Sequence, residues 1–115
     1  MERKEISVYT KLEKNEENYN IMAIKNNNVI KYIDLANNKM VIDMENDIIT
    51  RENSEYEFTL DFKKNKIFIY AKKLKMDFIK EIKTLILTRK KNSYLVRYSL
   101  MEENMVNEYF VKFKN

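Results

Sequence analysis

The chain of 115 residues contains no glycine, proline, cysteine, histidine or tryptophan. Without histidine and cysteine it cannot assemble a Ser-His-Asp or Cys-His nucleophile system, nor hold zinc through imidazole and thiolate groups. Without glycine it has neither a P-loop nor the GxGxxG turn that binds dinucleotides. The lack of cysteine also excludes disulfides and fits a reducing compartment. We therefore expect a protein that is not an enzyme and needs no cofactor.

The residues that are present indicate one globular domain spanning 1–115. Apolar residues make up 44% of the chain and charged residues 35%, a balance typical of folded proteins. The N-terminal segment lacks the apolar stretch of about 7–15 residues found in signal peptides, and apart from Ile67–Ala71 no apolar run is longer than Ile21–Ile24. We expect a cytoplasmic location and no membrane partner. The abundance of lysine, asparagine and isoleucine, whose codons are AT-rich, indicates a bacterial source.

Asparagine takes over the role that glycine and proline usually have in turns. Asparagine tolerates the left-handed backbone conformation that tight turns require. Its clusters recur along the chain between segments rich in apolar residues. We predict that Asn27, Asn38, Asn65 and Asn92 lie at or beside turns, some of them with positive φ.

Short segments with strand periodicity lie between these turns. Two hairpins are clear, because apolar and polar residues alternate in Glu55–Phe62 before Ile67–Tyr70, and in Tyr94–Met101 before Tyr109–Phe113. Weaker strands are predicted near residues 6–12, 20–24, 29–35, 40–44 and 48–51. The segment Ala71–Leu87 fits a helix or a strand equally well. About eight to ten strands spaced roughly ten residues apart are typical of an antiparallel barrel or sandwich.

Three features in order resemble a known family. They are Ile48–Arg51, an Arg-ended strand before the alternating Tyr56–Phe62; Phe78–Leu87, which carries Thr84 near its apolar end; and Tyr94–Leu100 with its closing strand. In these features the stretch from Val41 to Asn115 resembles the YwiB-like proteins, an uncharacterised bacterial family. The family usually has glycine where this chain has residues such as Asn53 and Met76. The resemblance implies an all-β, antiparallel, up-and-down barrel of the calycin (lipocalin-like) type, with Ala71–Leu87 as strand, and implies no activity.

A small barrel leaves two interpretations of its interior. About eight strands enclose a space just wide enough for packed side chains or for one small ligand. The residues predicted to face inward are Tyr56, Phe58, Leu60, Phe62, Ile67, Ile69, Tyr94, Val96, Tyr98, Leu100, Tyr109, Val111 and Phe113. They are either a packed core or the lining of a cavity. In a cavity, the hydroxyls of Tyr94, Tyr98 and Tyr109 would orient the polar end of a ligand, because buried hydroxyls need partners.

Two of the four arginines are candidate ligand contacts. Arg51 lies at a strand end, where it would anchor one end of the barrel and meet an anionic ligand. Arg97 lies opposite the Tyr94–Leu100 apolar stripe, so strict alternation points it outward, toward Glu108 on the next strand. For both residues the alternative is a surface or rim ion pair, which contributes little to stability.

The charges are segregated along the chain. Residues 1–60 carry 8 basic and 12 acidic side chains, whereas residues 61–91 carry 11 basic and 3 acidic ones. A basic stretch of this kind attracts nucleic acid, with Phe68, Tyr70 and Phe78 available for stacking, or it is simply a solvated face. The predicted basic patch within 63–91 comprises Lys63, Lys64, Lys72, Lys73, Lys75, Arg89, Lys90 and Lys91.

Acidic residues gather at two places. Asp43–Asp47 loosely resembles a calcium loop, but it lacks the glycine and the terminal glutamate of such loops, so we predict a polar hairpin turn. Glu55, Glu57 and Asp61 share one face of a strand, where we expect solvated side chains rather than a catalytic carboxylate pair. The sequence thus favours a non-enzymatic cytosolic barrel that binds a small apolar or amphipathic ligand or a partner protein. A nucleic-acid-binding module that uses residues 63–91 is the alternative.

Overall fold

The structure, a computed structural model, describes residues 2–101 and 103–114. The described residues form ten strands and contain no helix. The strands are β1 (Glu2–Leu12), β2 (Asn15–Asn26), β3 (Val29–Ile33), β4 (Lys39–Asp43), β5 (Ile48–Glu52), β6 (Tyr56–Asp61), β7 (Lys66–Ala71), β8 (Met76–Lys90), β9 (Ser93–Leu100) and β10 (Val106–Phe113). The segment Ala71–Leu87, whose pattern fitted a helix or a strand, comprises the last residue of β7, a turn and most of β8.

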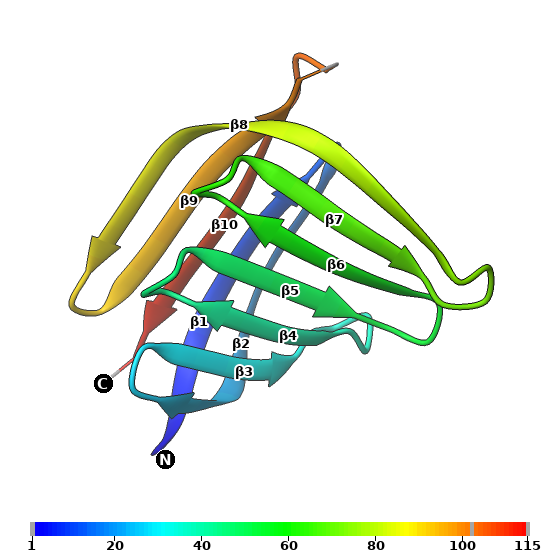
Figure 1. Cartoon of the computed structure of the whole chain (residues 1–115). Coiled ribbons are helices and arrows are strands. Elements are labelled where there is room, and N and C mark those ends of the chain that lie inside the picture. Colours follow the sequence, from blue (N-terminus) through cyan, green and yellow to red (C-terminus); the bar gives the residue numbers. More distant parts are fainter. Residues whose placement is uncertain (1, 102, 115) are drawn as a thin grey trace.

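The ten strands close into one antiparallel up-and-down barrel. Each strand pairs with the next along the chain, and β10 pairs with β1 to complete the ring. The predicted all-β barrel is therefore confirmed. Because consecutive strands run in opposite directions, successive turns lie alternately at the two ends of the barrel (Figure 1). We call the end with the β1–β2, β3–β4, β5–β6, β7–β8 and β9–β10 connections the mouth, and the other the closed end.

Branched aliphatic side chains fill the closed half of the barrel. Ile30, Ile42 and Ile49 face inward from three neighbouring strands and are fully buried. Val8 and Val111 pair with each other on the opposite wall and are also fully buried. Most of these residues come from the weaker strands of the sequence analysis. The period-two alternation of a strand places them on one face of the sheet, and closure of the sheet turns that face into the core.

Asparagine occupies several of the turns, as predicted. Asn27, Asn37 and Asn65 have left-handed φ values of 56°, 64° and 55°. Asn38 follows the β3–β4 turn and Asn92 lies in the β8–β9 turn. The left-handed conformation also occurs at three residues of other types. These are Glu13, Asp47 and Lys75.

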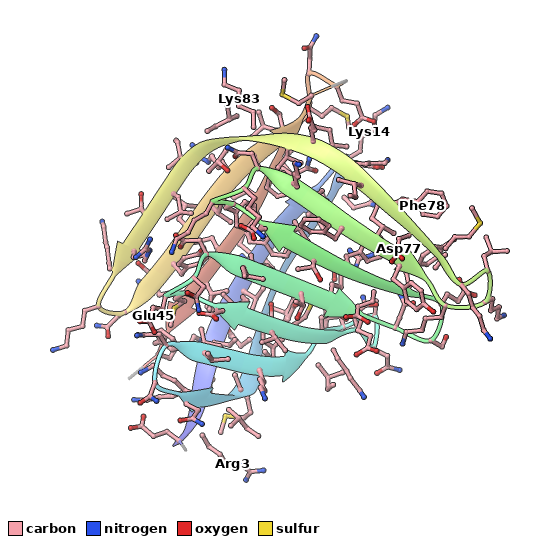
Figure 2. The ribbon with its side chains drawn as sticks, viewed as in Figure 1. Arg3, Lys14, Glu45, Asp77, Phe78 and Lys83 are labelled. Carbon is pink, nitrogen blue, oxygen red and sulfur yellow. The ribbon has the colours of Figure 1, made fainter. Side chains whose placement is uncertain are left out.

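Strict alternation was wrong for two residues near the barrel ends, Tyr56 and Asp61. Tyr56 is 39% exposed because it starts β6 at the rim, where no opposite wall covers it. Asp61 is buried instead of solvated, because its carboxylate accepts hydrogen bonds from the backbone amides of Lys63 and Lys64 in the following turn. Phe78 belongs to the part of β8 that extends beyond β9, and its side chain points away from the barrel (Figure 2).

A buried carboxylate fastens the closed end. Asp47 ends the β4–β5 turn with a φ of 57° and is 3% exposed. Its Oδ2 accepts a hydrogen bond of 2.6 Å from Arg89 Nη2, and its Oδ1 accepts one of 3.1 Å from the Tyr94 hydroxyl. Asp43, at the start of the same turn, accepts hydrogen bonds from the amides of Glu45 and Asn46. The acidic segment Asp43–Asp47 is thus a hairpin turn, as predicted.

We expect Asp47→Ala to lower the free energy of unfolding by about 2–4 kcal/mol. The substitution removes two hydrogen bonds to a buried carboxylate, one of them charge-assisted, and places a Cβ-bearing residue without a polar side chain in the left-handed region. Asp47→Asn is the matched control, because asparagine tolerates this backbone and keeps an acceptor, so its loss should be less than half as large. Urea denaturation measures both. Equal losses of unfolding free energy in the two variants would show that the negative charge of Asp47, and not its hydrogen-bond acceptor or its backbone conformation, stabilises this turn.

Candidate ligand-binding cavity

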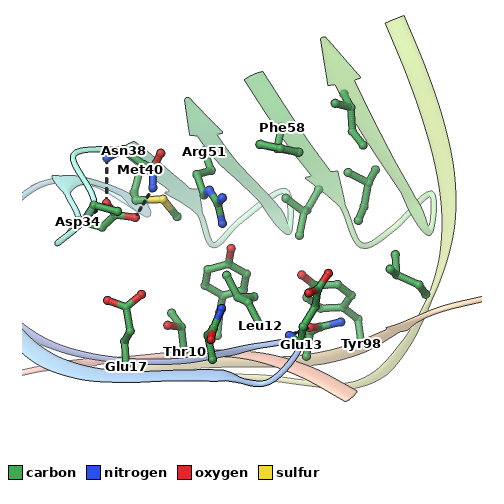
Figure 3. Close-up of a pocket in the computed structure, with 18 of the residues that line it drawn as sticks. Thr10, Leu12, Glu13, Glu17, Asp34, Asn38, Met40, Arg51, Phe58 and Tyr98 are labelled. Atoms are coloured by element: carbon green, nitrogen blue, oxygen red, sulfur yellow. Dashed lines mark hydrogen bonds between the residues drawn. The ribbon is translucent and has the colours of Figure 1, made fainter. Parts of the chain in front are cut away.

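The mouth half of the barrel is hollow. A cavity of about 440 Å³ opens between two walls of the sheet. Asn38, Met40, Arg51 and Phe58 project into it from one wall, and Thr10, Leu12 and Tyr98 from the other (Figure 3). The interior is therefore neither entirely packed nor entirely empty. The interpretation as a packed core applies to the closed half, and the interpretation as a cavity lining applies to the mouth half.

The register of the strands explains why the walls part here. The ladder between β2 and β3 comprises only three pairs, from Ile24–Lys31 to Asn26–Val29. The ladder between β8 and β9 starts at Ile82–Leu100, so residues 76–81 of β8 pair only with β7. The walls formed by β3–β8 and by β9, β10, β1 and β2 are thus joined at the closed end and separate toward the mouth. Ten strands also enclose a wider interior than the eight that side chains alone fill.

One row of side chains across β3–β7 forms the first wall of the cavity. Cross-strand pairs connect Tyr32 to Met40, Met40 to Arg51, Arg51 to Phe58 and Phe58 to Ile69. All five residues line the cavity. The Arg51 guanidinium lies over the Phe58 ring, with 5.2 Å between its central carbon and the ring centroid. Arg51 faces inward because it lies two residues after the buried Ile49 on the same strand.

Polar and apolar groups share the opposite wall. Thr10 on β1 is paired with Tyr109 on β10, and Tyr98 on β9 is paired with Asn107. These four residues are buried. The Asn107 side chain is held by the backbone amide of Glu13, which donates a 2.7 Å hydrogen bond to its Oδ1. Leu12 and Leu100 complete this wall nearer the mouth, and Tyr19, which pairs with Val8, completes it farther from the mouth.

Three side chains brace the rim of the cavity. Asp34 accepts hydrogen bonds from the backbone amides of Ala36 and Asn38, and from the Asn38 side-chain amide at 3.0 Å (Figure 3). Asn38 in turn accepts a 3.1 Å hydrogen bond from Asn53. Asn53 also caps the β5–β6 connection by accepting hydrogen bonds from the amides of Glu55 and Tyr56. The β3–β4 and β5–β6 connections are thus tied together, which fixes this side of the mouth.

The tyrosines of the cavity are held in their protonated form. Burial raises the pKa of Tyr32, Tyr98 and Tyr109, and the nearby Arg51 guanidinium only partly offsets this effect at Tyr98 and Tyr109. Burial, with a smaller contribution from Asp34 and Glu17, also raises the pKa of Tyr19. Protonated phenols donate hydrogen bonds. The cavity therefore presents hydroxyl donors beside one guanidinium.

The predicted ligand contacts fall into two groups. Arg51, Tyr98 and Tyr109 line the cavity, on both walls. Tyr94 does not, because its hydroxyl is at the closed end and bonded to Asp47. Arg97 does not either: it lies on the outer face and forms an ion pair with Glu108, as alternation predicted.

The predicted basic patch is divided between the two ends of the barrel. Lys72, Lys73 and Lys75 lie in the β7–β8 turn at the mouth, and Lys72 is paired with Glu52 at 2.7 Å. The other members lie at or next to the β6–β7 and β8–β9 turns of the closed end, where Arg89 is bonded to Asp47. They are Lys63, Lys64, Arg89, Lys90 and Lys91. The stretch 63–91 therefore does not form one continuous basic surface.

Sequence reasoning missed several residues that line the cavity. Tyr19 and Tyr32 lie in strands whose alternation was weak, and Thr10 and Asn107 are polar residues at positions that face inward. The one available signal for Tyr32 was the period-two pattern in which Ile30 and Tyr32 lie on either side of the polar Lys31. Nothing in the local sequence marks Asn38 and Asp34 as rim residues, because their roles depend on contact between two separate turns.

Comparison with protein-family models, with curated proteins and with solved structures finds no match to the chain. Within residues 2–101 and 103–114, no helix is long and apolar enough to cross a membrane. Over the same residues, no group of three or more acidic side chains is placed to hold a metal ion. The function must therefore be inferred from the cavity.

We expect the protein to lose stability as the pH rises above about 10, the ordinary pKa of tyrosine. Burial raises the pKa of Tyr19, Tyr32, Tyr94, Tyr98 and Tyr109. Above pH 10 the unfolded chain releases these protons while the folded chain retains them, so ionisation favours unfolding. Absorbance at 295 nm and circular dichroism, recorded together, should show these phenols ionising as the barrel unfolds. Complete ionisation of all phenols with an intact barrel would contradict this expectation.

Proposed function

We propose that the protein binds a small amphipathic ligand in the mouth of the barrel, without converting it chemically. The observation that carries the proposal is the cavity of about 440 Å³ in a barrel whose other half is packed. Small-molecule sites typically have volumes of roughly 300–1,000 Å³, mostly apolar walls and a few placed polar groups. The volume of this cavity lies within that range, and its lining is about equally polar and apolar.

The two sides of the cavity differ in polarity. Apolar side chains of β6 and β7 (Phe58, Leu60, Ile67 and Ile69) cover one region. Hydroxyl and amide groups from β1, β3 and β10 cover the other, including Tyr32, Tyr109 and Asn107. A molecule with one apolar and one polar part satisfies both regions, whereas a purely apolar molecule would leave the buried polar groups without partners. The lining groups lie inside the barrel, which favours a small molecule over a partner protein.

The cellular setting is part of the proposal. The absence of cysteine supports a cytoplasmic barrel that stores, carries or senses its ligand. The resemblance of Val41–Asn115 to the YwiB-like family supports a calycin-type barrel. The division of the basic residues between the two ends weakens the nucleic-acid alternative, because such binding needs a continuous positive surface.

We expect decanol, as a neutral amphipathic probe, to bind wild-type protein and to bind Ile69→Trp at least tenfold more weakly. Ile69 lines the cavity and is half-buried, so an indole at this position occupies the space of the ligand. The matched control is Ile86→Trp, which adds the same ring to an exposed position on β8. Isothermal titration calorimetry measures the affinities, and native mass spectrometry of gently purified protein tests for added mass. Equal affinities of the two variants would place binding outside the cavity.

A further inference from the structure

Arg51 is a half-buried charge that forms no ion pair with another described residue. Five ion pairs join described residues, and none of them involves Arg51. Its Nε is buried and has no hydrogen-bond partner in the structure. Burying part of a guanidinium without a partner is costly, and the cost is recovered only when an acceptor reaches it. The Phe58 ring beside the guanidinium offers no lone pair, and the nearby Tyr109 hydroxyl carries no charge to balance that of Arg51.

A second polar group in the same cavity also lacks a partner. Tyr32 is 5% exposed, lines the cavity, and its hydroxyl forms no hydrogen bond in the structure. Tyr109 lies close enough to both Arg51 and Tyr32 to interact with each electrostatically. The unpartnered donors of Arg51 and Tyr32 therefore belong to one polar site, which also includes the Tyr109 hydroxyl.

From these groups we infer that the ligand of the proposed function carries a carboxylate, held by Arg51, Tyr32 and Tyr109. The guanidinium offers a planar fork of N–H donors that matches the two oxygens of a carboxylate, and protonated phenols add single donors. The apolar part of the ligand then lies on Phe58, Leu60 and Ile69, beside the guanidinium. This inference rests on the proposed function and specifies the chemical class of the ligand.

The other charges of the cavity restrict the ligand to a single negative charge. Arg51 and Lys80 are the basic residues in the lining, whereas Glu13, Glu17 and Asp34 are acidic. Three acids against two bases leave a small negative balance at the mouth, so a dianion such as an alkyl phosphate is repelled more strongly than a monoanion. An aliphatic or aromatic monocarboxylate fits both the hydrogen-bond donors of the polar site and the charge balance of the cavity lining.

Three probes with the same ten-carbon chain test the inference at pH 8. We expect decanoate to bind wild-type protein at least tenfold more tightly than decanol and more tightly than decyl phosphate. In Arg51→Met, decanoate should lose this advantage, while decanol should bind within about threefold of wild type, because methionine preserves the apolar stem over Phe58. Arg97→Met, which removes an arginine from the outer face, should leave every affinity unchanged. Titration calorimetry provides the affinities and thermal melts verify folding.

Tyr32→Phe separates ligand binding from a structural role. It removes an unpartnered hydroxyl, so the melting temperature should stay the same or rise, while the affinity for decanoate should fall at least threefold. Equal binding of decanoate and decanol to wild-type protein would overturn the inference of a carboxylate and leave the proposed function intact. Preference for decyl phosphate would replace the carboxylate with a phosphate. Failure of all three probes to bind would refute the proposed function itself.

Discussion

Closure of a single antiparallel ladder is the constraint on which the rest of this structure depends. Because the ring is completed between β10 and β1, every strand has one face toward a common interior, and the alternation of side chains decides which residues enter it. Arg51 faces inward for this reason alone, two residues after the buried Ile49. The same ladder also produces the cavity, because the short β2–β3 pairing and the late start of the β8–β9 pairing leave the walls unjoined at the mouth.

The two halves of the interior use different side chains for different purposes. Isoleucine and valine, which have few rotamers and no polar side-chain atoms, supply most of the fully buried side chains, and Tyr94 joins them at the closed end. Tyrosine and arginine dominate the polar part of the mouth half, where their length carries hydroxyl and guanidinium groups into the space between the walls. An interior selected only for stability would not retain an unpartnered Nε and an unpartnered hydroxyl. The closed half therefore stabilises the barrel, and the mouth half carries the unpartnered polar groups on which the proposed ligand binding rests.

The sequence predicted the fold more fully than the site. Alternation located β6 and β9 well, but it left Ala71–Leu87 undecided because residues 76–81 of β8 are exposed on both faces and keep no apolar side. Alternation also says nothing about where a barrel ends, so Tyr56 was assigned to the core and Asp61 to solvent. Within the cavity, Arg51, Tyr98 and Tyr109 were predicted, whereas Tyr32 and Asn38 were not. Their places follow from cross-strand register and from contact between separate turns, which single-sequence periodicity does not contain.

Up-and-down topology also explains why a basic stretch of sequence does not become a basic surface. Turns about ten residues apart lie at opposite ends of the barrel, so Lys63 and Lys64 are separated from Lys73 and Lys75 by the length of a strand. The lysines of the β7–β8 turn instead stand at the mouth, and Lys80 of the adjoining strand lines the cavity. Positive charge on this side of the mouth partly offsets the acidic residues Glu13, Glu17 and Asp34 of the lining. The topology that divides the predicted basic patch between the two ends thus also places lysines beside the cavity that contains the half-buried Arg51 guanidinium, which is compatible with the proposed monocarboxylate ligand.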